Sequence, residues 1–157
     1  MNVLSDHRIE HFLKSAPVKL TAMASELGIP VFLSSLAPAI SGLIEPDEES
    51  PSGFRIRLNR HESKERQRFT LAHEIAHFLL HRSLIGGGVV DDTMYRSALS
   101  SRREVEANKL AADLCMPQKL IRLERSNRMH LSDDDLVNEM AALFRVSKSA
   151  MRIRLGV

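Results

Sequence analysis

The chain has 157 residues, of which 43% are hydrophobic and 27% are charged. This balance is typical of one globular domain with a hydrophobic core, and it excludes a disordered chain or a membrane protein. The formal net charge of +2 at pH 7 is far from the dense positive surface of a dedicated nucleic-acid-binding protein, so nucleic-acid binding is not expected.

The first third of the chain predicts two helices and two short strands. Pro17 suits the first turn of a helix and Gly28 suits its end, so we expect a helix between them. The acidic stretch EPDEESPS at 45–52 contains two prolines and no periodicity, which indicates an exposed loop. The predicted elements before this loop are helices at 8–14 and 18–27 and strands at 29–33 and 40–44.

Residues 54–58 predict the clearest strand, because apolar and basic side chains alternate there with a period of two. Two interpretations of this strand remain open. Its edge is free and accepts an extended substrate segment as a further strand, or it is paired on both sides within the sheet.

Serine residues in capping positions mark several of the helices in the rest of the chain. Ser63 predicts a helix that ends near His81, and glycines 86–88 begin a loop that reaches about residue 101. Ser132 is followed by three aspartates, which are favourable near a helix N-terminus. Further helices are predicted at 103–115, from Pro117, after Ser132 and after Ser147.

These elements make a mostly helical α+β protein with a small antiparallel or mixed sheet. We expect a single domain over residues 1–157, with 1–16 as an N-terminal extension and 117–157 as a C-terminal helical subregion. The N-terminal residues lack the basic and apolar stretches of a secretory signal, so a cytoplasmic protein that does not contact membranes is expected.

The predicted helix at 63–81 contains the pattern HExxH, formed by His73, Glu74 and His77. Residues four apart lie on one helix face, so both imidazoles can bind the same metal ion. Glu74 lies beside His73 around the helix, where it can act on a water as a general base without binding the metal. The alternative is a chance pattern in which both histidines are hydrogen-bonded core residues.

A catalytic zinc ion takes three protein ligands, so a third residue must come from elsewhere. His81 lies about 12 Å along the helix axis from His73, which is too far for one small ion. Glu104 shares a helix face with small residues that allow close packing, whereas Glu106 lies among charged ones. We therefore predict Glu104 as the third ligand of a single catalytic Zn²⁺, although nitrogen and oxygen ligands also suit other divalent ions.

Four further residues have expected roles around this site. Asn108 either accepts a hydrogen bond from a ligand histidine or is an ordinary helix residue. Tyr95 and His81 are candidates for stabilising the negative charge of the transition state, and His81 is alternatively a structural contact at the rim. Cys115 is expected to be a small core side chain.

Two segments of the chain resemble the ImmA/IrrE family of HExxH metallopeptidases. They are RQRFTLAHEIAHFLLH at 66–81 and EVEANKLAADLCMP at 104–117, and together they are far more specific than HExxH alone. The resemblance extends from about Pro17 to the C-terminus.

The resemblance implies a compact zincin-like metallopeptidase domain that cleaves or inactivates a helix-turn-helix repressor in response to stress or mobile-element signals. We expect that repressor to be a separately encoded protein. The function predicted from the sequence is therefore a zinc-dependent endopeptidase that hydrolyses a peptide bond in such a regulatory protein.

A second class of function is a regulatory module with a non-catalytic metal site. Residues 136–155 have the apolar spacing of a helix-turn-helix and end in basic residues, which is compatible with DNA or partner binding. The same pattern fits two amphipathic helices that pack on the domain. A relative that keeps zinc but no longer cleaves is a third alternative, and the oligomeric state stays open.

Overall fold

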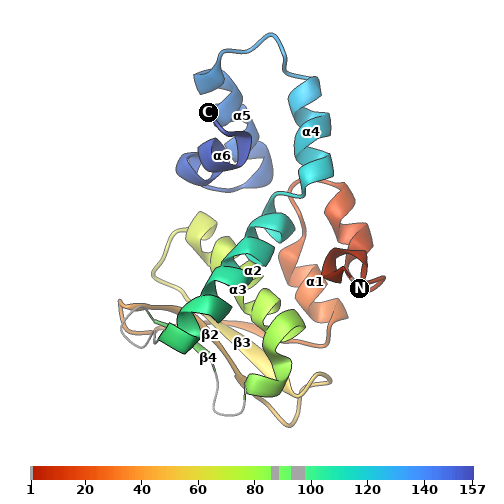
Figure 1. The fold of residues 1–157 in the computed structure, drawn as a ribbon. Helices are drawn as coiled ribbons and strands as arrows, with labels where there is room; N and C mark the ends of the chain where they lie inside the picture. The colour runs from red at the N-terminus through yellow and green to blue at the C-terminus, as the bar shows by residue number, and fades with distance from the viewer. Residues whose placement is uncertain (1, 86–88, 93–97) are drawn as a thin grey trace.

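The computed structural model describes residues 2–85, 89–92 and 98–157. Within these residues it is mostly helical, with six α-helices and one small mixed sheet (Figure 1). No helix among the described residues has the length and apolar character needed to cross a lipid bilayer.

The sheet has the strand order β1-β3-β2-β4. The central strand β3 (Phe54–Asn59) pairs in parallel with β1 (Val31–Ser34) and antiparallel with β2 (Ile40–Pro46), and β2 also pairs antiparallel with β4 (Val89–Asp92). Because β3 has a neighbour on each side, the hypothesis that its edge accepts a substrate strand is wrong. β1 and β4 lie at the two edges of the described sheet.

The alternation predicted for β3 separates its two faces. Ile56 and Leu58 are buried on the face that packs against α2 (Lys64–His81). On the opposite face, Arg55 donates from its Nε to the Glu45 carboxylate at 2.6 Å. One face of the strand is therefore apolar and carries the central helix, and the other is held by an ion pair.

The helix α2 crosses this apolar face (Figure 1) and is capped as predicted, since the Ser63 hydroxyl accepts a hydrogen bond from the backbone N–H of Arg66 at 3.2 Å. Every residue from Thr70 to Phe78 is buried. The HExxH residues therefore lie in the middle of the molecule, where polar side chains need partners.

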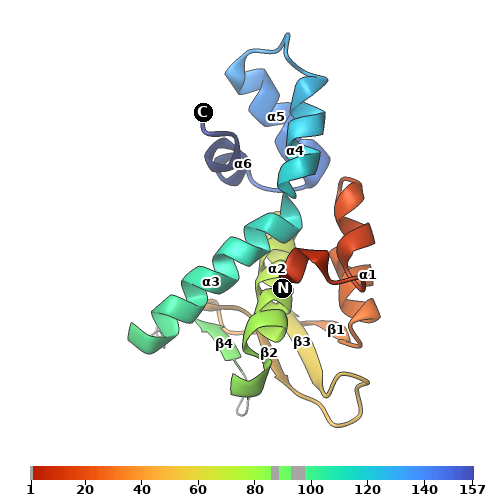
Figure 2. The ribbon, with the colours of Figure 1, turned by 45° about the vertical axis from the view of Figure 1, so that its right-hand side comes forward.

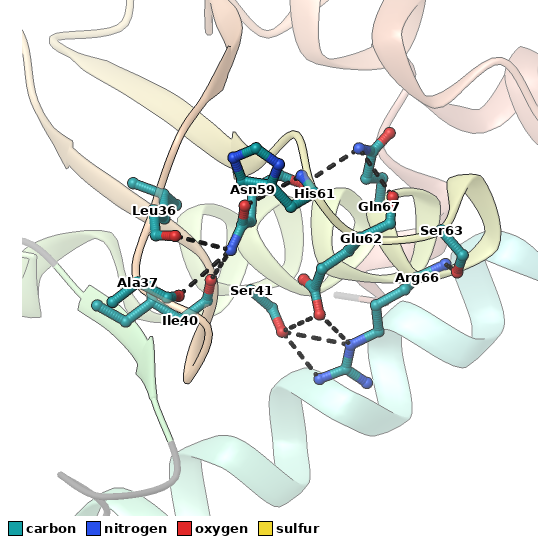
Figure 3. A network of polar contacts seen from close by, with 10 residues as sticks. All are labelled: Leu36, Ala37, Ile40, Ser41, Asn59, His61, Glu62, Ser63, Arg66 and Gln67. Carbon is teal, nitrogen blue, oxygen red and sulfur yellow. Dashed lines mark hydrogen bonds and ion pairs between the residues drawn. The ribbon is translucent and has the colours of Figure 1, made fainter.

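A buried asparagine holds the chain where β3 turns into α2 (Figure 3). The Asn59 amide donates to the carbonyl oxygens of Leu36 and Ala37 at 3.3 Å and of Ile40 at 2.9 Å. The Gln67 side chain donates to the Asn59 carbonyl oxygen at 3.1 Å. These bonds tie the loop between β1 and β2 to the first turn of α2.

The N-terminal region differs in part from the predicted helices. In place of a helix at 8–14, the chain forms two 3₁₀ helices, Val3–Ser5 and Glu10–Lys14. The next helix, α1 (Leu20–Glu26), begins three residues after Pro17, because Lys19 has a non-helical backbone conformation. It ends as predicted before Gly28, whose φ of 77° belongs to the left-handed region that favours glycine.

Four helices follow α2: α3 packs beside α2, and α4, α5 and α6 lie together at the end of the molecule away from the sheet (Figure 2). α3 begins at Ala98, five residues earlier than the start near Arg103 that was predicted after the glycine-led loop. Ser132 and Ser147 cap the last two helices as predicted. The bounds are α3 Ala98–Cys115, α4 Gln118–Ser126, α5 Asp133–Phe144 and α6 Lys148–Leu155.

α6 is fixed to the end of α3 by a partly buried arginine. Arg154 donates to the carbonyl oxygen of Met116 at 2.6 and 2.9 Å and to the carboxylate of Asp113 at 2.7 Å. The last helices therefore pack on the rest of the chain, while the division into an extension at 1–16 and a subregion at 117–157 stays a prediction.

Candidate metal centre

Three buried side chains meet between α2 and α3. His73 Nε2 lies 2.9 Å from one carboxylate oxygen of Glu104, and His77 Nε2 lies 2.9 Å from the other. The two Nε2 atoms are 3.1 Å apart. A shared metal ion needs several histidine, cysteine, aspartate or glutamate side chains close together. Among the described residues, His73, His77 and Glu104 form such a group, because one donor atom from each lies within 4.8 Å of the other two.

The local sequence explains why two helices can bring these groups together. His73 and His77 lie one turn apart on α2, and Glu104 lies on α3, which packs against α2. Alanines with no exposed surface occur on both helices, and such small side chains allow two helices to approach closely. They are Ala72 and Ala76 on α2 and Ala107 and Ala111 on α3.

The donor set fits a small divalent metal. Zinc binds histidine nitrogen at about 2.0–2.1 Å and carboxylate oxygen at about 2.0–2.2 Å, so donors around a tetrahedral zinc ion lie roughly 3.3 Å apart. His73 and His77 lie 2.9 Å from different oxygens of Glu104, and one donor atom from each of the three residues lies within 4.8 Å of the other two, so all three are near enough to share one ion. Two imidazoles and one carboxylate also leave a fourth position open, as catalytic zinc sites do.

The surroundings of Glu104 favour its ionised carboxylate, which is the form that binds a metal ion. Burial by itself raises the pKa of this carboxyl group, but hydrogen bonds from His73 and His77 outweigh it and hold the pKa well below its usual range. Glu104 is therefore ionised at neutral pH, and a carboxylate is the form that binds a metal ion.

Glu74 lies beside this group without belonging to it. It follows His73 directly on α2 and has no exposed surface. Glu74 is not one of the three converging donors, and its role as a general base stays a prediction.

His81 lies behind His77 and away from Glu104. Its Nδ1 is 3.0 Å from His77 Nδ1, and its Nε2 is 3.6 Å from a carboxylate oxygen of Glu106. Burial lowers the pKa of His81, and the neighbouring His77 adds to this effect. Both ring nitrogens face protein groups, so this placement favours a supporting contact over stabilisation of a transition state.

The roles predicted for Asn108 and Tyr95 have no support from the described contacts. No hydrogen bond of Asn108 to either HExxH histidine occurs within the described part of the chain, so its supporting role stays a prediction. Tyr95 lies outside the described residues. The sequence left His81 either as a transition-state stabiliser or as a structural contact at the rim, and the structure places it against His77.

One cleft between the described residues lies away from this centre. It has a volume of about 1060 Å³ and lies between the first half of α2, the edge strand β1 and the start of α6. A smaller groove of about 330 Å³ between α2 and α6 is lined by Phe69, whose ring lies 6.5 Å from that of His73. Phe69 therefore connects this groove to the helix turn that carries His73.

Comparison with known proteins gives one family. The model of a peptidase family, described as the IrrE N-terminal-like domain, matches residues 24–156. This range includes α2 and α3 with all three converging residues. No curated protein matches the chain.

Proposed function

Given that the chain belongs to the peptidase family of the IrrE N-terminal-like domain, we propose that it is a zinc-dependent endopeptidase with a zincin-like domain. Its substrate is a regulatory protein, and the resemblance of its two motifs favours a separately encoded helix-turn-helix repressor in the cytoplasm. The single observation that carries the proposal is the convergence of His73, His77 and Glu104.

His73, His77 and Glu104 hold the zinc ion, two through neutral imidazoles and one through a carboxylate. When bound, zinc supplies a Lewis acid that polarises the scissile carbonyl and lowers the pKa of the attacking water. The buried helix that carries both histidines fixes their separation, so little reorganisation is needed on metal binding.

Glu74 moves the protons of the reaction. Its carboxylate accepts the proton that the water loses as it attacks the scissile carbonyl carbon, and it then delivers this proton to the nitrogen of the leaving amine. The apolar residues around it on α2, such as Ile75 and Phe78, are buried and keep bulk water away, which strengthens the electrostatic interactions within the site.

A duplex-DNA-binding function is less well supported by the C-terminal helices. A recognition helix needs basic side chains that are free to reach phosphates or bases. In α6, Arg152 pairs with the carboxylate of Asp134, and Arg154 pairs with Asp113. These arginines stabilise the packing of the helices, which favours the interpretation of 136–155 as two amphipathic packing helices.

The proposal is tested by incubating zinc-loaded protein with a peptide library and with candidate repressors, with cleavage detected by mass spectrometry. We expect wild type to cleave, Glu74→Gln to bind zinc in equal stoichiometry but cleave at least about a thousandfold more slowly, and Glu65→Gln to behave as wild type. Glu65 is an exposed glutamate on the same helix, so it is a matched control. Cleavage by Glu74→Gln at the wild-type rate, or a wild type that binds no zinc, would overturn the proposal.

A further inference from the structure

A row of three histidines runs along one face of α2, and its last member does not reach the metal centre. His81 is 7% exposed and lies four residues after His77. Its Nδ1 is 3.0 Å from the Nδ1 of His77, on the opposite side of that ring from the atom that faces Glu104. His77 therefore has Glu104 at one nitrogen and His81 at the other.

The arrangement assigns a direction to the hydrogen bond between the two rings. A histidine that binds a metal through Nε2 in its neutral form carries its proton on Nδ1. His77 must then donate from Nδ1, and His81 must accept at its own Nδ1. A neutral His81 that accepts at Nδ1 carries its proton on Nε2, which is the nitrogen 3.6 Å from the Glu106 carboxylate.

The helix α3 supplies the acidic group at each end of this row. Glu104 contacts the Nε2 atoms of His73 and His77, and Glu106, two residues later, faces His81. The Glu106 side chain is 49% exposed, and its carboxylate also lies 3.8 Å from the Nε of Arg102. Glu106 therefore contacts His81 from the protein surface. The Glu106 carboxylate then faces the Nε2–H of His81 at 3.6 Å, just beyond hydrogen-bond distance, and the Nδ1 of His81 faces the Nδ1–H of His77.

We propose that His81 is a positioning residue that fixes the proton of His77 on Nδ1 and orients its ring for metal binding, and that Glu106 orients His81 in turn. This inference rests on the proposed metal site and adds to it a residue outside the HExxH pattern. Outer partners of this kind stabilise the ligand tautomer, and their loss typically weakens metal affinity about 10- to 100-fold.

Three variants separate this role from simple core packing. His81→Leu fills similar space but accepts no hydrogen bond. His81→Asn places its amide oxygen near the position of Nδ1, so it can accept from His77. Glu106→Gln keeps an oxygen that can accept from His81 Nε2. A packing role predicts that Leu is tolerated and Asn is not, whereas the positioning role predicts the reverse.

The experiment measures two quantities on the full chain, the dissociation constant for Zn²⁺ alone by chelator competition and the hydrogen exchange of the His77 Nδ1–H by ¹⁵N NMR of the zinc-loaded protein. We expect His81→Leu to weaken zinc binding about 10- to 100-fold and to speed the exchange of the His77 Nδ1–H, because that proton loses its acceptor. His81→Asn and Glu106→Gln should stay within about fivefold of wild type.

Two results would overturn the inference. One is His81→Leu with wild-type zinc affinity and unchanged hydrogen exchange of the His77 Nδ1–H, and the other is His81→Asn as weak as His81→Leu although both fold. A wild type that binds zinc but cleaves nothing contradicts the proposed peptidase activity and leaves the exchange result valid. A wild type that binds no zinc overturns both.

Discussion

Gly42 of β2 lies directly against Thr70 of α2, so closely that a Cβ atom on residue 42 would be 2.6 Å from the Thr70 Cγ2 and 2.9 Å from the carbonyl oxygen of Arg57. This contact sets the distance between the sheet and the helix that carries both histidines of the metal centre. Glycine is therefore required here by the close approach of the two elements rather than by its backbone angles.

We predict that Gly42→Ala destabilises the protein by about 1–3 kcal/mol, because the extra methyl group must displace α2 or the backbone of β3. The free energy of unfolding in urea measures this effect. Thr70→Ser removes Cγ2 but leaves the Arg57 carbonyl in place, so the double variant should recover part of the loss. If the effects of the two substitutions on the free energy of unfolding were strictly additive, the contact with Thr70 could not be the cause of the destabilisation.

A second prediction concerns Asn59, whose amide donates to the carbonyl oxygens of Leu36 and Ala37 in the loop between β1 and β2 and of Ile40 at the start of β2 (Figure 3). Asn59→Ala should cost about 1–3 kcal/mol, because these carbonyls lose their donor. Asn59→Asp keeps the shape but cannot donate and brings a carboxylate against them, so it should be at least as destabilising. Urea unfolding of both variants checks this, and an aspartate variant as stable as wild type would contradict it.

A third prediction concerns metal-linked stability. Zinc at about a hundred times its dissociation constant should stabilise wild type by about 2.7 kcal/mol, and a chelator should reverse this. Glu104→Ala should remove most of the effect, because it deletes one of three donors. Val105→Ala is the control, since Val105 is the next residue on α3 and is 67% exposed. Thermal unfolding with and without zinc measures the shift, and an equal shift in Glu104→Ala would count against this ligand set.

A fourth prediction concerns Cys115 and pH. Burial raises the pKa of its thiol from 9.0 to about 12. The folded state therefore keeps the thiol protonated where the unfolded chain ionises it, so this contribution to stability is complete below pH 9 and is lost as the pH rises from 9 toward 12.

Two measurements check the state of Cys115. Iodoacetamide at pH 8 should leave the native protein unmodified and should label it in urea, since the thiolate is the reactive form. Between pH 9 and 11, wild type should lose more unfolding free energy than Cys115→Ala. Rapid labelling of the folded protein, or equal pH slopes, would show that the thiol is accessible.

Local chemistry made much of this structure predictable from the sequence. Ser63, Ser132 and Ser147 begin the helices that they were expected to cap, because a serine hydroxyl accepts from a backbone N–H only three residues away. The separation of His73 from His77 by one turn follows from helix geometry alone. Glu104 was predicted as the third ligand in place of Glu106 because Glu104 lies on the helix face that carries small and apolar side chains.

Other features depend on segments that lie far apart in the chain. The strand order that encloses β3 arises from backbone pairing, which side-chain alternation does not specify, so the sequence left β3 equally open to an edge position. The contact of His81 with Glu106 depends on how α2 and α3 are positioned along each other, which the sequence pattern of either helix does not specify.

The sequence by itself therefore determined the helix caps at Ser63, Ser132 and Ser147 and the candidate residues for binding a metal, because these depend on neighbours within one or two turns. Only the tertiary structure decided that the three donors meet, which histidine lies behind them and how closely Gly42 lets α2 approach the sheet. Those relationships result from the packing of distant elements, where a shift of one ångström decides whether atoms touch.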